Sequence, residues 1–180
     1  MIRSVCDFLD NSALKFPNKI AFVEGQKSIS YKDFNKITSA VASKILEFLI
    51  KKEPILIILP KGIDALISMF SVAKSGNFYS IIDEKMPRER VEKIIAKLRP
   101  KLIITSKELY FDYEIPAIFS DDFATFSANQ TALNAVNIID TDLLYVLFIN
   151  LLLSAVFFIA ILINFLLPLN LPDESFTKIP

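Results

Sequence analysis

The amino-acid sequence predicts an α/β fold, with a partial parallel sheet flanked by helices and an apolar segment after it. Between positions 55 and 105, short apolar runs alternate with segments of helical periodicity, and the connections between them are short. That alternation is typical of parallel strands joined by right-handed crossovers. Residues 143–167 are 25 consecutive positions without a charge, which makes them a candidate transmembrane helix.

Composition excludes several classes of function. The 180 residues carry 20 basic and 20 acidic side chains. The chain therefore has no net positive charge that would favour binding to nucleic acid. Histidine is absent, which excludes a Ser-His-Asp triad and every His-ligated metal site. The single Cys6 cannot form an internal disulfide, and we expect it to be a small packing residue. The three glycines lie too far apart for a glycine-rich phosphate loop.

The N-terminal part predicts a helix, a hairpin and a second helix. Apolar residues at helical spacing predict a first helix that ends before Pro17 and buries one face, composed of Val5, Phe8, Leu9, Ala13 and Phe16. A strand over 19–24 turns at Gly25 and returns through 28–30. Ser30 is then placed to cap a second helix, with Asp33 three residues later. The predicted inner face of that helix is Phe34, Ile37, Val41, Ile45 and Phe48.

The next fifty residues predict the parallel sheet. Apolar runs over 55–59, 78–82 and 101–105 are the expected strands, the first bounded by two prolines. Helical patterns separate them, one ending at Gly76 and the other beginning at Pro87 and ending before Pro100. Positions 108–142 hold seven acidic and no basic residues, and we expect loop there, with one short strand over 116–119.

Four segments of this pattern resemble the N-terminal region of adenylate-forming, AMP-binding enzymes. The run I-S-Y-K-D-F-N at 29–35 is similar to that family's L-T-Y-x-E-L-N. V-A-K-S-G-N-F-Y-S-I-I-D at 72–83 is similar to L-K-A-G-x-A-Y-V-P-L-D, with Ile81 in place of the usual Pro. M-P-R-E-R at 86–90 and K-L-R-P-K-L-I-I-T at 97–105 match the continuation. The resemblance covers about 140 residues and is nearest to peptide-synthetase adenylation domains and D-alanine–carrier-protein ligases.

This resemblance implies an enzyme that activates a carboxylate, here of an amino acid, with ATP. The acyl-adenylate would then pass to the thiol of a carrier protein or of coenzyme A. ATP and Mg²⁺ are the implied cofactors, and a carrier protein and an amino acid the implied partners. In the family, the phosphate loop, the magnesium-binding acid, the ribose-binding Asp and the mobile lysine all follow the region matched here. No catalytic, cofactor-binding or metal-binding residue is therefore carried over to this chain.

The resemblance stops at the expected phosphate loop. D-L-L-Y-V-L-F at 142–148 resembles the strand that leads into the family's T-S-G-S-T-G-x-P-K-G, but I-N-L-L-L follows at 149–153. These residues offer no lysine and no glycine to hold a phosphate. We therefore expect an interrupted, inactive ligase fragment with three parts: the N-terminal portion of an adenylation domain at 1–142, the apolar segment at 143–167 and a short tail at 168–180.

The apolar segment has more than one interpretation. As a helix it would extend about 37 Å, enough to cross a bilayer, and Asn150 and Asn164 would share one face. The chain would then be a membrane-anchored, non-catalytic binding module. Disrupted coding sequence explains the same apolarity, and the missing part could also be supplied by a separate chain. No signal peptide is recognisable at the N-terminus, so we expect a cytoplasmic location, at the membrane only if the segment is an anchor.

Charged residues near the predicted strand ends have both structural and functional interpretations. Asp83 and Lys61 follow strands at the edge where parallel sheets bind ligands, although a turn or cap role explains each of them as well. A phosphate clamp is conceivable for the charged residues of the helix after Pro87, but a solvated helix face explains them better. Those residues are Arg88, Glu89, Arg90, Glu92 and Lys93.

Overall fold

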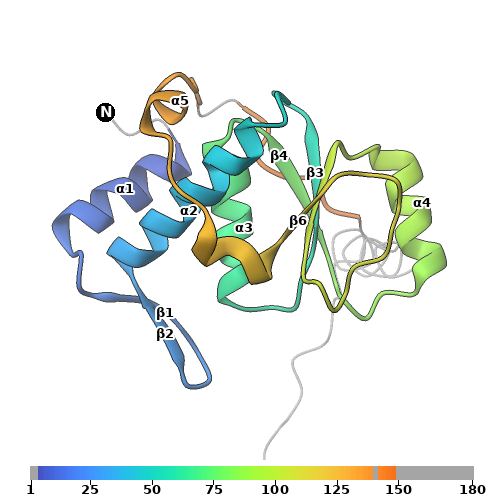
Figure 1. The fold of residues 1–180 in the computed structure, drawn as a ribbon, viewed down its shortest axis with the longest axis horizontal. Coiled ribbons are helices and arrows are strands. Elements are labelled where there is room, and N and C mark those ends of the chain that lie inside the picture. Colours follow the sequence, from blue (N-terminus) through green and yellow to red (C-terminus); the bar gives the residue numbers. More distant parts are fainter. Residues whose placement is uncertain (1–3, 140–141, 149–180) are drawn as a thin grey trace, which may run out of the picture. The chain divides into compact units, whose positions relative to one another are not determined.

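The computed structural model describes residues 4–139 and 142–148 (Figure 1). In chain order its elements are α1 (Val5–Lys15), β1 (Ile20–Glu24), β2 (Lys27–Ser30), α2 (Tyr31–Leu46), β3 (Pro54–Ile58), α3 (Ile63–Lys74), β4 (Phe78–Ile82), α4 (Arg88–Leu98), β5 (Leu102–Thr105), β6 (Ala117–Phe119), the 3-10 helix η1 (Ser120–Thr125) and α5 (Gln130–Asn134).

The main sheet confirms the predicted α/β architecture. Its four strands are parallel in the order β4-β3-β5-β6. In register, Ile57 of β3 pairs with Ile81 of β4 and Ile104 of β5. The chain runs from β3 through α3 to β4, and then from β4 through α4 to β5 on the other side of β3. Because parallel crossovers are right-handed, α3 and α4 lie on opposite faces of the sheet. Figure 1 shows α2 and α3 on one side of the sheet and α4 on the other.

The core lies between the sheet and the pair α2 and α3. Phe34 of α2 is fully buried and contacts the rings of Phe22 and Phe70, with centroids 4.8 and 5.4 Å away. All five residues of β3 are buried, as predicted for a strand covered on both faces. Fully burying one such aliphatic side chain contributes about 1.5–3 kcal/mol, so this strand anchors the fold.

The hairpin and the second helix form as the sequence predicts. β1 and β2 pair antiparallel, with Gly25 at φ +57° in the turn. The Ser30 hydroxyl accepts a hydrogen bond from the Asp33 N–H at 3.1 Å and donates one to the Asp33 carboxylate at 2.7 Å. This is the expected cap of α2.

Two sequence predictions about helices are wrong in detail. The first helix buries Cys6 and Leu9, while Val5, Phe8 and Phe16, predicted as part of its inner face, are exposed. The buried face also carries Asp10, one turn after Cys6, and the Asp10 carboxylate contacts the buried Lys74 ammonium at 2.7 Å. The segment after β6, predicted to be loop, contains η1 and α5. Both are too short for their periodicity to show.

Residues 143–148 are the part of the apolar segment that the structure describes. They extend the main sheet and do not form a helix. Tyr145 forms a parallel bridge with Tyr79 at the outer edge of β4, so the helix predicted over 143–167 is wrong for residues 143–148. The Leu144 carbonyl and the Val146 N–H bond to Tyr79 of β4 instead of to a helical turn. Positions 149–167, with Asn150 and Asn164, lie outside the described residues. Within the described ranges, no helix has the length and apolarity needed to cross a membrane.

We predict that Ser30→Ala lowers the free energy of unfolding by about 1 kcal/mol, because the Asp33 N–H at the start of α2 loses its acceptor. Chemical denaturation measures this change. Ser28→Ala, an exposed position in the same hairpin, is the matched control and should change stability by less than about 0.5 kcal/mol. Equal effects of the two substitutions would contradict the capping role.

Candidate functional site

A large cavity lies at the carboxyl ends of the strands. Its volume is about 780 Å³, and its walls include the loops after β3, β5 and β6 together with the β1–β2 hairpin. The connection after β3 leads to one face of the sheet and the connection after β4 to the other, so the neighbourhood of β3 is a topological switch point. Open parallel sheets bind ligands at such a crevice. We call this cavity the carboxyl-edge cleft.

The floor of the carboxyl-edge cleft is apolar and its rim is acidic. The hydrophobic lining residues are Ile29, Ile37, Leu59, Ile63, Ile67 and Leu109. Five carboxylates and one ammonium group surround them, contributed by Glu24, Asp64, Glu84, Glu108, Asp121 and Lys27. The potential in the cleft is therefore negative, which disfavours anions.

The N-terminus of α3, the obvious anion site in this cleft, is already occupied by a side chain. The Glu24 carboxylate accepts a hydrogen bond from the Ile63 N–H at 2.8 Å. A Cβ atom at Gly62 would overlap that carboxylate, so glycine at position 62 is what allows Glu24 to reach the helix. The positive end of the helix dipole is thus neutralised from within the chain.

The opposite wall of the cleft is held by a second carboxylate. Asp121 accepts a hydrogen bond from the Lys107 N–H at 2.8 Å, and the Lys107 ammonium contacts Asp122 at 2.7 Å. Between the walls, burial raises the pKa of Asp64. Lys27 counteracts that rise, while the charges of Glu24 and Asp121 add to it. The acidic groups of the cleft therefore repel one another.

These residues do not fit ATP with Mg²⁺. A triphosphate needs backbone N–H groups and cations, whereas the α3 N-terminus already binds the Glu24 carboxylate and five carboxylates line the cleft. Among the residues that the structure describes, no three His, Cys, Asp or Glu side chains are placed to share a metal ion. No step of nucleotide chemistry can be assigned to this cleft.

The site residues weighed from the sequence lie in a turn, beside a groove and on a helix surface. The Asp83 carboxylate accepts a hydrogen bond from the Lys85 N–H at 2.8 Å, as in a turn, and its neighbour Glu84 lines the cleft instead. Lys61 is exposed and lines a different, apolar groove. Arg88 pairs with Glu92 at 2.8 Å and stacks over Phe111, 3.5 Å from the ring centroid. The charged face of α4 is thus a solvated surface.

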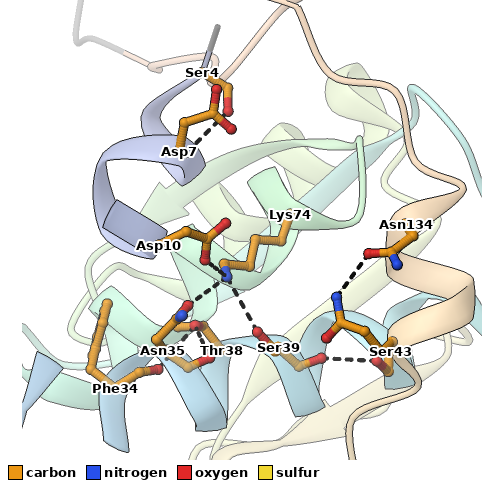
Figure 2. A network of polar contacts seen from close by, with 11 residues as sticks. Ser4, Asp7, Asp10, Phe34, Asn35, Thr38, Ser39, Ser43, Lys74 and Asn134 are labelled. Atoms are coloured by element: carbon orange, nitrogen blue, oxygen red, sulfur yellow. Dashed lines mark hydrogen bonds and ion pairs between the residues drawn. The ribbon is translucent and has the colours of Figure 1, made fainter. Parts of the chain in front are cut away.

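A buried lysine that sequence analysis missed joins the three N-terminal helices (Figure 2). Lys74, the last residue of α3, is 8% exposed. Its ammonium contacts Asp10 of α1 at 2.7 Å, and Asn35 and Ser39 of α2 at 2.6 and 3.2 Å. All three ammonium protons therefore have acceptors, which leaves the group no capacity for a ligand. Cys6 lies in the same region, and burial raises the pKa of its thiol to about 12, so the thiol is unreactive.

Comparison with known protein families gives a direct match. The family model described as AMP-binding enzyme matches residues 9–144, which is most of the chain. The chain belongs to the AMP-binding enzyme family. Among relatives, it is 27% identical over 108 residues to tyrocidine synthase 1 of Brevibacillus parabrevis, covering 59% of this chain and 10% of that protein. Gramicidin S synthase 1 of Brevibacillus brevis matches with the same identity and coverage.

Solved structures show the same fold. The nonribosomal peptide synthetase FmoA3 superposes with a TM-score of 0.72 at 18% identity, over 81% of this chain and 16% of that chain. The N-terminal subdomain of Klebsiella oxytoca NpsA gives a TM-score of 0.68 at 17% identity, over 83% of this chain and 38% of that chain. The AMP-binding chain described here thus spans about a tenth of the curated relatives above and well under half of that subdomain.

For this AMP-binding family member we predict that Lys27→Met raises the pKa of Asp64 further, because the substitution removes the cation that counteracts the rise. NMR titration of the Asp64 carboxyl carbon measures this pKa in the parent chain and in the variant. Asp64 binds a proton more tightly in the folded than in the unfolded chain. The contribution of Asp64 to the free energy of unfolding therefore increases as the pH falls through the pKa of this group in the folded chain. Lys93→Met on α4 is the control, and a pKa unchanged by Lys27→Met would contradict the charge assignment.

We also predict that Lys74→Met lowers the free energy of unfolding by about 2 kcal/mol, because Asn35 and Ser39 lose a charged donor within the packed helices. Lys44→Met is the matched control, since the Lys44–Glu47 ion pair is exposed and should contribute less than about 0.5 kcal/mol. Urea denaturation compares the two. Unchanged or increased stability of the Lys74 variant would show that apolar packing can replace the network, as happens at some buried ion pairs.

Proposed function

We propose that this chain is the N-terminal part of an adenylation domain of the nonribosomal peptide synthetase type. In such a domain the carboxylate of an amino acid attacks the α-phosphorus of ATP, pyrophosphate leaves, and the acyl-adenylate passes to a carrier-protein thiol. The relatives named above support the peptide-synthetase branch over the D-alanine–carrier-protein ligases. A cytoplasmic location accords with this assignment.

The strand extension at residues 144–146 carries the proposal. The Tyr79 N–H donates to the Leu144 carbonyl at 3.1 Å, and the Val146 N–H donates to the Tyr79 carbonyl at 2.8 Å. These residues therefore run parallel to β4, toward the carboxyl edge of the sheet. This is the direction expected of a strand that delivers a phosphate loop to the ligand-binding edge.

We further propose that the chain by itself does not adenylate. Ile-Asn-Leu-Leu-Leu follows at 149–153, and these residues supply neither the glycine-rich turn nor the lysine that a phosphate loop uses. The acidic carboxyl-edge cleft does not compensate for this, because its carboxylates would repel a triphosphate. The role of this chain is then to provide one wall of the adenylation fold, and ATP and Mg²⁺ belong to the completed domain.

We predict that the purified chain catalyses no amino-acid-dependent exchange of radiolabelled pyrophosphate into ATP in the presence of Mg²⁺. All twenty amino acids are tested as a mixture, with tyrocidine synthase 1 as the positive control. The physical reason is that neither the acidic carboxyl-edge cleft nor residues 149–153 supply cations or a glycine-rich turn to stabilise charge at the α-phosphate of ATP. Exchange above the enzyme-free blank would refute the proposal that the isolated chain is inactive.

A further inference from the structure

The tip of the β1–β2 hairpin stands between two cavities. One is the carboxyl-edge cleft, and the other is an apolar groove of about 430 Å³ between the hairpin, α3 and β4, which we call the β4 groove. Three residues line both cavities, namely Glu24, Gly62 and Ile63. These are the residues that form the contact between the Glu24 carboxylate and the α3 N-terminus. That contact is therefore part of the wall that the two cavities share.

The hairpin is fixed to the rest of the fold at two points, one of which is this contact. β1 and β2 form a two-stranded sheet of their own (Figure 1). Below the tip, the Phe22 ring packs on Phe34 of α2, whereas residues 23–28 are exposed. Among the described residues, the bond from the Ile63 N–H to Glu24, at 2.8 Å, is the one hydrogen bond that joins the hairpin to α3. The position of the tip thus depends on a single polar contact.

Within α3 nothing can replace that hydrogen bond. The first N–H groups of a helix have no acceptor inside the helix, and Gly62, the residue before α3, has no side chain that could cap it. The negative charge of Glu24 is also favourable at the positive end of the helix dipole. If the tip moves away, water is the alternative partner of both the carboxylate and the N–H. Exposed segments with few apolar contacts open locally in this way.

We propose that Glu24 is a latch, and that the hairpin tip is a flap closing the passage between the carboxyl-edge cleft and the β4 groove. With the latch formed, the acidic and the apolar cavity are separate. With the latch released, residues 23–28 move away from α3 while Phe22 stays packed on Phe34. The two cavities then join into one hollow with an acidic and an apolar end. This device involves no nucleotide chemistry and does not depend on the proposed function.

Gly62 offers a second way to release the latch. Its backbone is extended, with φ 173°, a conformation that any residue adopts. The three atoms that a Cβ at position 62 would meet first all belong to the Glu24 carboxyl group, and it would overlap them. Because a flexible side chain yields before the backbone does, Gly62→Ala should displace the carboxylate. Glu24→Ala removes the same contact from the other side.

The test measures the position of the hairpin tip in the full chain by double electron–electron resonance. Spin labels are attached at Gln26→Cys in the hairpin turn and at Lys93→Cys on α4, both exposed positions, while the native Cys6 is buried. We expect one narrow distance distribution in the parent chain. In Glu24→Ala and in Gly62→Ala, a displaced population should grow at least about tenfold relative to the closed one, since hydrogen bonds to charged groups are the stronger ones.

The double variant Glu24→Ala, Gly62→Ala tests whether both changes act on one contact. Without the carboxylate, a methyl group at position 62 has nothing to displace, so the double variant should show the same open fraction as Glu24→Ala. Glu108→Ala is the matched control, because it removes another carboxylate of the cleft and should leave the distribution unchanged. Thermal melting confirms that each variant folds. An unchanged distribution in either single variant, or additive effects in the double variant, overturns the proposal.

Discussion

The structure depends on one constraint, which is that β3 must be covered on both faces and paired along both edges. Its five residues are buried without exception, and both of its neighbours run parallel to it. Parallel neighbours need crossover connections, and a fixed crossover handedness then sends α3 and α4 to opposite faces. The same geometry brings the loops after β3, β5 and β6 together at one edge. The carboxyl-edge cleft is thus a consequence of burying β3.

Elements governed by local chemistry could be predicted from the sequence. The β4 strand has the predicted bounds, because Gly76 at φ +73° ends the preceding helix and the apolar run after it is unbroken. The Ser30 cap was equally visible, since a capping residue and its partner lie three positions apart in the chain. The charged face of α4 was predicted as well, but its Arg88–Phe111 contact was not, because 23 positions separate the two residues and no pattern links them.

Features that arise from tertiary contacts could not be predicted. Lys74 is a lysine in the last turn of a helix, a position where solvent exposure is the usual outcome. Its burial becomes favourable only because α1 and α2 bring Asp10, Asn35 and Ser39 to the same point. The same side of α1 faces α2 and α3, and Phe8 is exposed against the expectation from its spacing. In the same way, the Glu24 carboxylate and the α3 N-terminus are 39 positions apart, so no local motif indicates their contact.

The Glu24 contact also determines what the described part of this sheet edge offers to a ligand. Such an edge normally offers helix N-termini to anions, and in this chain the helix that follows the central strand has its N-terminus closed by a carboxylate of the hairpin. Gly62 permits the approach and Asp64 adds a further negative charge. The α3 N-terminus is therefore closed to an anionic ligand. The strand extension at Tyr145 runs toward the same edge from the outer side of β4, where none of these carboxylates has been placed. The acidic cleft and the extension at Tyr145 therefore approach one edge of the sheet from opposite sides of β4, and only the first of the two is lined by carboxylates.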